Sequence, residues 1–424
     1  MTRLMMWRPR IASAAWVAIP TLMWWRTTAA PPWGPPPLVI RKVAILFALI
    51  GFTTFTQNLL LVARIKPIER FLGGLDRVYK FHEHLALLTL ALLGTHGILM
   101  GTVFAGWGAA EGFGWKVVLG AIAFGGLAGG IGVTFRAPID REAFIWVQRT
   151  LGAMFGVGSI HAIVIPGALG VAPVVRYYLI VAACLGGGGY VYRSVVGRFL
   201  PRRRYRVESV NRLDPQTAEI TLSPRFRRLR YRAGQFAFLT IDGGNVTREP
   251  HPYSIASAPA DENLRFLIKA LGDYTTKLQE LQPGCRARVE GPYGWFWHKG
   301  SDNPRQIWIA GGVGVAPFLG MAKTVDFSRV GVDLYYCTEG PEQAHLIDEL
   351  FAIADENPSL RVVPIRKRSL GHIDADDIGG ASLQLTRSDI FICGPPVMMQ
   401  SLDDQFRARG VPRSQIHFED FSFM

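Results

Sequence analysis

The sequence predicts a multidomain chain made of a bundle of six transmembrane helices, an antiparallel β-barrel and a doubly wound α/β domain. Three observations predict this fold. Long apolar stretches fill residues 1–200, short alternating runs separated by turn residues follow from about residue 203, and strand and helix patterns alternate after about residue 300. We therefore expect domains at 1–200, 201–300 and 301–424.

The chain carries a formal net charge of +13. Much of this excess flanks the apolar stretches, where Lys and Arg mark cytoplasmic loops, so we do not expect nucleic-acid binding. The four cysteines are scattered without a CxxC pair, which argues against an iron–sulfur cluster, a zinc site or a disulfide framework. The soluble half is therefore expected in a reducing compartment.

Six apolar segments approach the roughly 20 residues that a membrane-crossing helix needs. They lie at about 11–25, 43–63, 82–103, 115–135, 143–165 and 172–192. The first segment is short and follows Arg3, Arg8 and Arg10, so a cleaved signal sequence is the alternative to a retained helix. We expect a retained helix.

The charges of the loops predict the orientation. Lys and Arg cluster at 64–80, at 136–141 and at 193–206, whereas residues 104–115 and 166–175 contain neither. The positive-inside rule then places the N-terminus and the whole C-terminal half in the cytoplasm of a multi-pass protein of the cell (inner) membrane. Arg26, Arg41 and Lys42 run against this pattern.

Histidines within the apolar segments are the most informative residues of the first half, because ionisable groups are costly in a bilayer. His82 and His96 are 14 residues apart in one segment, which gives about 21 Å of helical rise on nearly the same face. His84 lies off that face, and His161 lies in the fifth segment. This spacing suits the axial ligands of two stacked haems. The alternative is a set of histidines that only bond neighbouring helices.

Three motifs follow one another in the barrel region. Residues 251–259 place an aromatic ring beside a hydroxyl, as a flavin ring with its reactive N5 requires. Residues 269–276 combine a glycine with a helix start whose N–H groups suit a pyrophosphate. Gly291-Pro292-Tyr293-Gly294 completes the series. Each motif alone is typical of a turn, but their order indicates an FAD-binding barrel.

The last third shows the pattern of a parallel sheet that binds a nicotinamide nucleotide. A buried strand at 306–310 leads into the glycine-rich turn at 311–317, whose backbone can approach a pyrophosphate. Cys393-Gly394-Pro395-Pro396 ends a later strand. Because the carboxyl ends of parallel strands meet at one edge, both turns are expected at one ligand site.

In this order the motifs resemble the ferredoxin–NADP reductase family, in particular its membrane branch of NADPH oxidases and ferric reductases. His251-Pro252-Tyr253-Ser254 resembles the flavin motif of that branch. The glycine-rich turn at 311–317 and Cys393-Gly394-Pro395 resemble its nicotinamide-nucleotide motifs. The six-segment half is similar to the ferric-reductase-like transmembrane domain.

The resemblance implies roles for individual residues. Tyr253 would stack on the flavin, Ser254 would bond its N5 and Cys393 would lie near the nicotinamide. Phe423 in the C-terminal tail would shield the other flavin face, with Phe421 or simple core packing as the alternatives. The other implied cofactor contacts are His251, Pro252, Lys269, Gly272, Asp273, Tyr274, Thr275, Gly311, Gly312, Gly314, Pro317, Gly394 and Pro395.

The resemblance also implies haem b, with one departure. The family carries two histidines in the fifth segment, but here Gln148 takes the inner position, and glutamine is a poor iron ligand. His96 and His161 would therefore hold an outer haem. The inner site keeps only His82 and would hold a weakly bound haem, nothing, or a flavin that reaches into the bundle.

The sequence thus predicts a membrane enzyme that passes electrons from NADPH or NADH through FAD to haem and an outer acceptor, such as O2, ferric iron or a quinone. Alternatives are an electron-supplying module for a partner protein and a membrane-anchored ferredoxin reductase. Glu339 favours NADH, whereas the basic run at 366–368 favours NADPH, which leaves the choice of nucleotide open.

Overall fold

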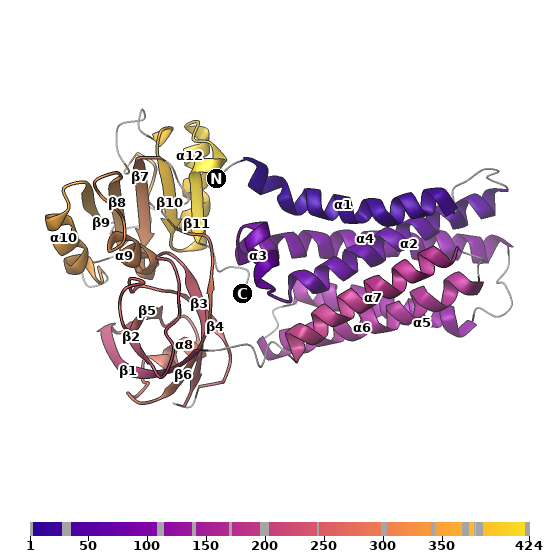
Figure 1. Cartoon of the computed structure of the whole chain (residues 1–424), viewed down its shortest axis with the longest axis horizontal. Helices are drawn as coiled ribbons and strands as arrows, with labels where there is room; N and C mark the ends of the chain where they lie inside the picture. The colour runs from indigo at the N-terminus through magenta and orange to yellow at the C-terminus, as the bar shows by residue number, and fades with distance from the viewer. Residues whose placement is uncertain are drawn as a thin grey trace. The chain divides into compact units, whose positions relative to one another are not determined.

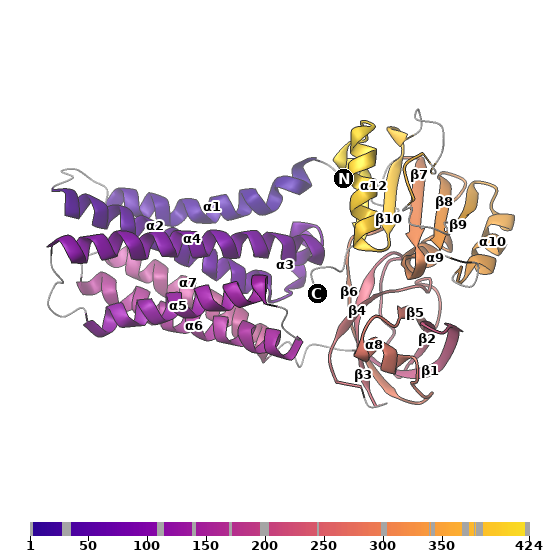
Figure 2. The ribbon, with the colours of Figure 1, turned by 180° about the vertical axis from the view of Figure 1, so that it is seen from behind.

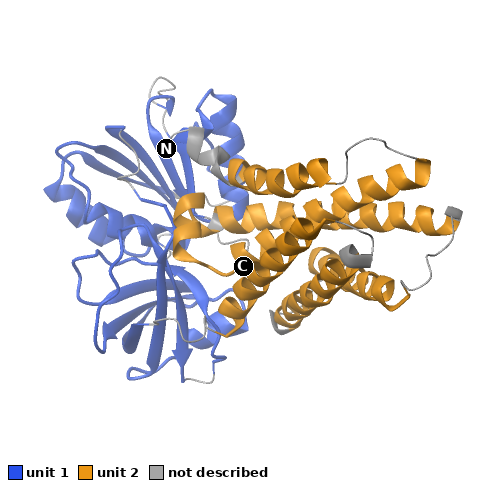
Figure 3. Cartoon of the chain, turned by 45° about the vertical axis from the view of Figure 1, so that its right-hand side comes forward, with its two compact units in different colours: residues 1–3, 200–424 blue, residues 4–199 orange. Residues whose placement is uncertain are grey.

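The computed structural model divides the 424-residue chain into two compact units (Figure 3), one of residues 4–199 and one of residues 1–3 and 200–424. Each unit is treated by itself below. The residues that the structure describes are 3–27, 35–107, 114–137, 141–168, 172–195, 203–243, 246–297, 303–338, 340, 344–366, 373–376, 378 and 385–419.

The first unit is helical, and its long helices run side by side in both views (Figures 1 and 2). Each of the six apolar segments that the sequence predicts coincides with one long helix and extends at most two residues beyond its ends. The helices are α1 (Arg3–Thr27), α2 (Pro36–Leu61), the short α3 (Lys66–Leu72), α4 (Leu75–Trp107), α5 (Gly114–Arg136), α6 (Arg141–Ala168) and α7 (Pro173–Ser194).

Four of the described helices are long and apolar enough to cross a membrane. They are α2, α4 over Arg77–Ala105, α5 and α7. A membrane-spanning role for α1 and α6 stays a prediction. Helix α2 has the most buried surface of the unit, because glycines let its neighbours approach it: a Cβ on Gly51 would lie 2.7 Å from a methyl carbon of Leu93 in α4.

The second unit begins with a six-stranded antiparallel sheet in the order β4-β3-β6-β1-β2-β5. The sheet curls so that Ala256, just after β4, donates its N–H to the carbonyl of Arg265 in β5 at 2.9 Å. Buried side chains from alternate positions fill its interior. The strands are β1 (Arg203–Asp214), β2 (Thr217–Pro224), β3 (Phe236–Asp242), β4 (His251–Ser254), β5 (Leu264–Lys269) and β6 (Arg286–Tyr293), and helix α8 (Asp273–Leu278) follows β5.

The chain then forms a five-stranded sheet in the order β11-β10-β7-β8-β9, with all neighbouring strands parallel. Helix α12 packs with the core on one face, while α9 and α10 contribute to the core on the other, which is the doubly wound arrangement that the sequence predicts. The elements are β7 (Arg305–Gly311), η3 (Gly312–Val315), α9 (Ala316–Ala322), β8 (Gly331–Thr338), α10 (Ile347–Glu356), β9 (Leu360–Arg366), β10 (Asp389–Cys393), α12 (Pro396–Ala408), η5 (Arg413–Gln415) and β11 (Ile416–Glu419).

The barrel and the parallel sheet share one hydrophobic core. Phe296, just beyond β6, meets Phe318 of α9 and Phe391 of β10 edge to face, at ring distances of 5.4 and 5.5 Å. Helix α9 also lies directly against the barrel, because a Cβ on Gly320 would stand 2.7 Å from the carbonyl oxygen of Ser257. The flavin motif and the dinucleotide turn are therefore parts of one packed unit.

Gly234 allows the close approach of β3 to Phe296, and replacing it should destabilise this unit. Its φ is +87°, and an added Cβ would collide with the carbonyl oxygen of Phe296. We expect Gly234→Ala to lower the free energy of unfolding by more than about 2 kcal/mol, measured as a lower thermal midpoint of the purified holoprotein.

Gly284→Ala is the matched control for that variant. Gly284 has a similar φ of +95°, but its added Cβ would meet open space. Equal destabilisation by both substitutions would show that backbone strain alone, and not the contact with Phe296, limits position 234.

Candidate functional site

The parallel sheet has its topological switch point between β7 and β10, which are neighbours in the sheet. Ligands of such sheets bind beyond the carboxyl ends of the strands at this point. The turn after β7 and the turn after β10 touch there: Gly394 lies so close to Gly311 that an added Cβ would stand 3.1 Å from the Gly311 backbone. The two motifs that the sequence predicts at one edge are thus brought together.

Gly312 and Gly314, in the turn after β7, have different structural roles. A Cβ on Gly314 would collide with the carbonyl oxygen of Cys393, so this residue is required for the packing of the two turns. Gly312 has a φ of +52° and faces open space, which leaves its backbone accessible to a ligand. Pro317 is buried in the first turn of α9, where its fixed φ suits a helix start.

The flavin motif and the nucleotide domain meet at Ser254. Its hydroxyl donates a 2.5 Å hydrogen bond to Oε2 of Glu419, and Sγ of Cys393 lies 3.9 Å from the same oxygen. Cys393 and Glu419 are direct partners in the register of β10 and β11. A hydroxyl, a thiol and a carboxylate from three strands therefore surround one point.

Glu419 was not predicted as a site residue, although a simple rule selects it. It ends a strand beside Cys393, at the sheet edge where ligands bind. A residue in register with a predicted site residue on the neighbouring strand is a candidate for the same site.

The other residues of the flavin motifs also cluster. The ring of His251 in β4 stacks on that of Tyr274 in α8, with 3.8 Å between ring centres. Thr275 accepts hydrogen bonds from the N–H groups of Leu271 and Gly272 and so holds the start of α8. The phosphate-facing donors implied for this turn are then those of Asp273 and Tyr274, at its first helical positions.

The remaining predicted residues of this half lie around the same region or outside the described residues. Tyr253 packs partly buried against the barrel core, Pro252 lies beside it in β4, and Lys269 ends β5. Phe421, Phe423, Glu339, Lys367 and Arg368 lie outside the described residues, as does the side chain of Arg366.

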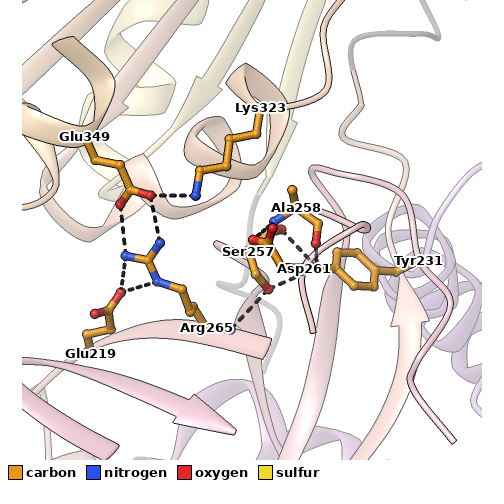
Figure 4. Close-up of polar contacts among 8 residues, drawn as sticks. All are labelled: Glu219, Tyr231, Ser257, Ala258, Asp261, Arg265, Lys323 and Glu349. Carbon is orange, nitrogen blue, oxygen red and sulfur yellow. Dashed lines mark hydrogen bonds and ion pairs between the residues drawn. The ribbon is translucent and has the colours of Figure 1, made fainter. Parts of the chain in front are cut away.

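The segment after the flavin motif is held by a set of polar contacts (Figure 4). The Tyr231 hydroxyl lies 2.7 Å from the Ala258 carbonyl and 3.0 Å from Ser257 Oγ, which itself accepts the backbone N–H of Arg265. Asp261 accepts the N–H of Ala258 at 2.8 Å. These bonds fix the chain from β4 to β5.

An ion network joins the barrel to the nucleotide domain (Figure 4). Arg265 of β5 makes two parallel bonds to Glu349 of α10, at 2.9 and 3.0 Å, and a third bond at 2.7 Å to Glu219 of β2. Lys323, just after α9, adds a 2.6 Å contact to Glu349. A second buried pair joins His345 Nε2 to Asp214 at 2.6 Å. None of these residues was predicted from the sequence.

The network affects the ionisation of its acids. Burial by itself would raise the pKa of Glu349, but the hydrogen bonds and charges of Arg265 and Lys323 outweigh it and lower that pKa. Burial likewise opposes the bonds from Gln216, Thr217 and His345 to Asp214, and the bonds again prevail and lower the Asp214 pKa. Both carboxylates are therefore charged at neutral pH and hold the two domains together.

Two predicted metal ligands meet in the helical unit. The ring centres of His96 in α4 and His161 in α6 lie 6.5 Å apart. Nδ1 of His96 lies 2.9 Å from the Ala44 carbonyl, and Nδ1 of His161 lies 2.7 Å from the Lys116 carbonyl. A carbonyl oxygen only accepts, so both Nδ1 atoms carry the proton and both Nε2 atoms keep a lone pair for a metal. A cluster of three or more His, Cys, Asp or Glu with metal-site geometry does not occur in the described ranges.

His82 has a different environment. Asn58 faces it: with its amide oriented to satisfy its neighbours, Asn58 donates to the His82 carbonyl at 3.0 Å and accepts from the N–H of Ala86. The His82 ring also bonds the backbone of Asn58. Near Gln148, the ring of Tyr190 fills the space beside Gly152, one turn further along α6. The structure therefore leaves no open space beside Gly152.

Known protein families match the two domains of the second unit. A family model of an FAD-binding domain matches residues 203–296, and a model of an oxidoreductase NAD-binding domain matches residues 308–404. The reductase component of propane 2-monooxygenase from Rhodococcus jostii is 26% identical over 236 residues, which cover 50% of this chain and 62% of that protein. The ferredoxin reductase component of 3-ketosteroid-9-alpha-monooxygenase from Mycobacterium tuberculosis is 30% identical over 201 residues, or 46% and 56% of the two chains. The matches thus span about six tenths of the length of these relatives.

Among solved structures, flavohemoglobin from Malassezia yamatoensis, determined with bound FAD and heme, aligns with a TM-score of 0.51. The alignment covers 91% of this chain and 98% of that one at 16% sequence identity. At this identity the likeness concerns the fold alone.

Glu419 is expected to position the Ser254 hydroxyl during reduction of the flavin. Loss of one charge-assisted bond costs about 1.5–3 kcal/mol, so Glu419→Gln and Ser254→Ala should each slow flavin reduction by NADH about 10- to 100-fold with normal FAD content. Stopped-flow flavin absorbance measures this rate. The double variant should be no slower than the worse single one, and fully additive losses would show that the two residues act separately.

Glu349 is expected to hold the nucleotide domain in place for hydride transfer. Glu349→Gln should lower the unfolding free energy by about 1–3 kcal/mol at pH 7 and slow flavin reduction several-fold. Because the folded-state pKa of Glu349 is lowered, its contribution is present at neutral pH and is lost as the pH falls through that value.

The thermal midpoints of wild type and Glu349→Gln should therefore approach each other as the pH falls below the ordinary glutamate pKa of about 4.3, and converge only below the lowered pKa of folded Glu349. Glu356→Gln, at the exposed end of the same helix, is the control and should match wild type throughout. A gap between wild type and Glu349→Gln that stays constant in acid would rule out the ion pair as its cause.

Proposed function

We propose that this chain, whose residues 203–404 belong to the ferredoxin–NADP reductase superfamily, is a transmembrane oxidoreductase that carries electrons from NAD(P)H to one haem b and to an acceptor across the membrane. Its second unit is an NAD(P)H-dependent flavin oxidoreductase module. The observation that carries the transmembrane part is the pair His96 and His161, which lies in the long helices α4 and α6 of the same chain.

The residues of the flavin module suit FAD. The stacked rings of His251 and Tyr274 and the start of α8 offer surfaces for a planar ring system and for phosphates, and the open backbone at Gly312 offers a surface for the nicotinamide nucleotide. Bound FAD would supply the step from the two electrons of a hydride to the single electrons that haem iron accepts. Ser254, oriented by Glu419, would hold a hydrogen bond at the flavin ring, and Cys393 would border the nicotinamide.

The outer histidine pair suits a six-coordinate haem. Two metal–nitrogen bonds of about 2 Å, with a ring radius of about 1 Å on each side, place opposed imidazole centres about 6 Å apart. The observed distance of 6.5 Å is close to this value. The Nδ1 bonds to Ala44 and Lys116 fix both rings from other helices, as is usual for metal-binding histidines. A haem held by His96 and His161 would supply one-electron transfer at this position.

The residues at the inner position favour a single haem in this chain, held at the outer position. Gln148 replaces the second imidazole, and Tyr190 fills space one turn away beside Gly152. Of the three occupants considered for this position, the weakly bound haem fits the packing least well.

Orientation and acceptor follow from charge and chemistry. The basic segments at 64–80, 136–141 and 193–206 favour a multi-pass protein of the inner membrane with the flavin module in the cytoplasm. The acceptor on the other side would be a small molecule such as O2, ferric iron or a quinone.

A second candidate is an electron-supplying module for a partner protein. The relatives that match the second unit are named as reductase components of oxygenase systems, which favours this role. The flavin chemistry would be unchanged, and the partner would take the place of the small acceptor.

Anaerobic reduction of the purified chain by NADH or NADPH tests the proposal. We expect one haem per flavin and the absorbance band of reduced b-type haem on addition of the nucleotide. His161→Ala should lose the haem and the band while flavin reduction continues, because one axial nitrogen is removed.

His84→Ala is the matched control, since His84 is exposed on the same helix as His96 and bonds only its own helix at Lys80. It should keep the haem. If the nucleotide reduces the flavin of the wild type and no haem band appears, the helices serve only as a membrane anchor. Haem reduction without turnover of small acceptors until a partner is added would select the second candidate.

A further inference from the structure

The barrel carries a block of arginines on its outer face. Arg204 and Arg206 of β1 stand directly opposite Arg288 and Arg286 of β6. Like charges in directly opposed cross-strand positions destabilise a sheet. Two such pairs side by side therefore indicate that an anion outside the barrel compensates for them.

A loop extends this block. Residues 225–232, with the sequence Arg-Phe-Arg-Arg-Leu-Arg-Tyr-Arg, connect β2 to β3. The loop lies against the start of β1, because the N–H of Arg225 donates to the Arg204 carbonyl at 2.9 Å and the N–H of Leu229 donates to the Tyr205 hydroxyl at 2.8 Å. Phe226 projects from it with 75% of its surface exposed. We call the arginines of this loop and of the β1–β6 block, together with Phe226, the arginine face.

Few acidic residues balance the arginine face. Asp242 lies 3.7 Å from Arg288 but also pairs with Arg248, and the pair of Arg228 with Glu262 is exposed and thus weak. Glu208, on the same side of β1, bonds Asn263. Within the part of the chain that the structure describes, no ion pair joins Arg204, Arg206, Arg225 or Arg227 to an acid.

The β1–β6 block of the arginine face is separate from the flavin machinery. Strands β1 and β6 are central in the strand order, whereas β4 and β5, which carry and border the flavin motifs, form its two ends. The loop does reach the segment after the flavin motif, through the bonds of Tyr231 to Ser257 and Ala258. The positive charge of the β1–β6 block is therefore not explained by the FAD phosphates.

The chain itself limits how far this face can be from a membrane. Strand β1 begins at Arg203, nine residues after the end of α7 at Ser194. Even a fully extended chain of that length reaches only about 30 Å. If α7 crosses the bilayer, as the proposed function holds, the start of β1 and the loop bonded to it are tethered close to lipid headgroups at high effective concentration.

We infer that the arginine face docks onto anionic phospholipid headgroups of the cytoplasmic leaflet. Clustered arginines bind lipid phosphates and are attracted by the negative surface potential of that leaflet, and an exposed aromatic side chain inserts at the headgroup level. The tether favours lipid over a diffusing acidic protein. The inference rests on the membrane tether of the proposed function and does not depend on haem.

Hydrogen–deuterium exchange of the full chain in nanodiscs tests this docking. Nanodiscs of phosphatidylcholine alone are compared with nanodiscs that also contain phosphatidylglycerol, and the peptide covering 225–232 is followed by mass spectrometry. We expect several-fold slower exchange in the anionic nanodiscs and loss of that difference in 0.5 M salt, because salt of about this strength screens exposed charges.

Two double variants decide which arginines are responsible. Arg225→Glu with Arg227→Glu should abolish the lipid-dependent difference. Arg387→Glu with Arg413→Glu changes the charge equally at exposed sites of the nucleotide domain and should preserve it. Unchanged flavin content and thermal midpoint verify that each variant is folded.

Equal exchange in both nanodiscs, or a difference that survives in Arg225→Glu with Arg227→Glu, would overturn the inference. Protection that appears only when an acidic electron-transfer protein is added would also overturn it and would identify a protein-docking face. The haem-free His161→Ala chain should keep the lipid-dependent protection, so failure of the haem proposal and failure of the docking proposal give different results.

Discussion

The hydrophobic core shared by the barrel and the parallel sheet is the constraint on which the flavin site depends. Phe296 leaves the barrel and packs between α9 and β10, and α9 approaches the barrel backbone at Ser257 as closely as a glycine allows. This packing sets the distance between β4 and β11. The 2.5 Å bond from Ser254 to Glu419 can form only while that distance is held. The ion network of Arg265 joins the same two domains. Its hydrogen bonds fix the orientation of the domains, which apolar packing alone would leave less specific.

Local sequence patterns predicted the strands of the second unit well, because alternation and glycine-rich turns are properties of neighbouring residues. The predicted strand at 306–310 lies within β7, and the two glycine turns meet as expected. The partners across the joint could not be predicted in this way. Arg265 and Glu349 are 84 residues apart, and each resembles an ordinary surface charge in its own segment. Only the relative placement of the two domains makes them a pair.

In the helical unit, too, the local sequence predicts some features, while others depend on contacts between helices. The spacing of His82 and His96 follows from helix geometry, but the nitrogen that each ring leaves free does not. The carbonyls of Ala44 and Lys116, on other helices, place the protons of His96 and His161. Asn58, also on α2, faces His82. The position of the proton on each ring is therefore decided by residues of other helices, which the local sequence pattern does not reveal.

Positive charge has two origins in this chain, which its composition alone does not separate. The basic loops between the helices follow from topology, since positive residues are retained on the cytoplasmic side of a membrane. Arg204 and Arg206 also follow a membrane segment closely. Arg286 and Arg288, which stand opposite them in β6, do not, and a sheet gains nothing from like charges in register. Topology requires positive residues only near the membrane segments and does not prescribe their position within a folded barrel. Their alignment on one face, beside a loop that exposes Phe226, is a property of the barrel and calls for an anionic surface outside it.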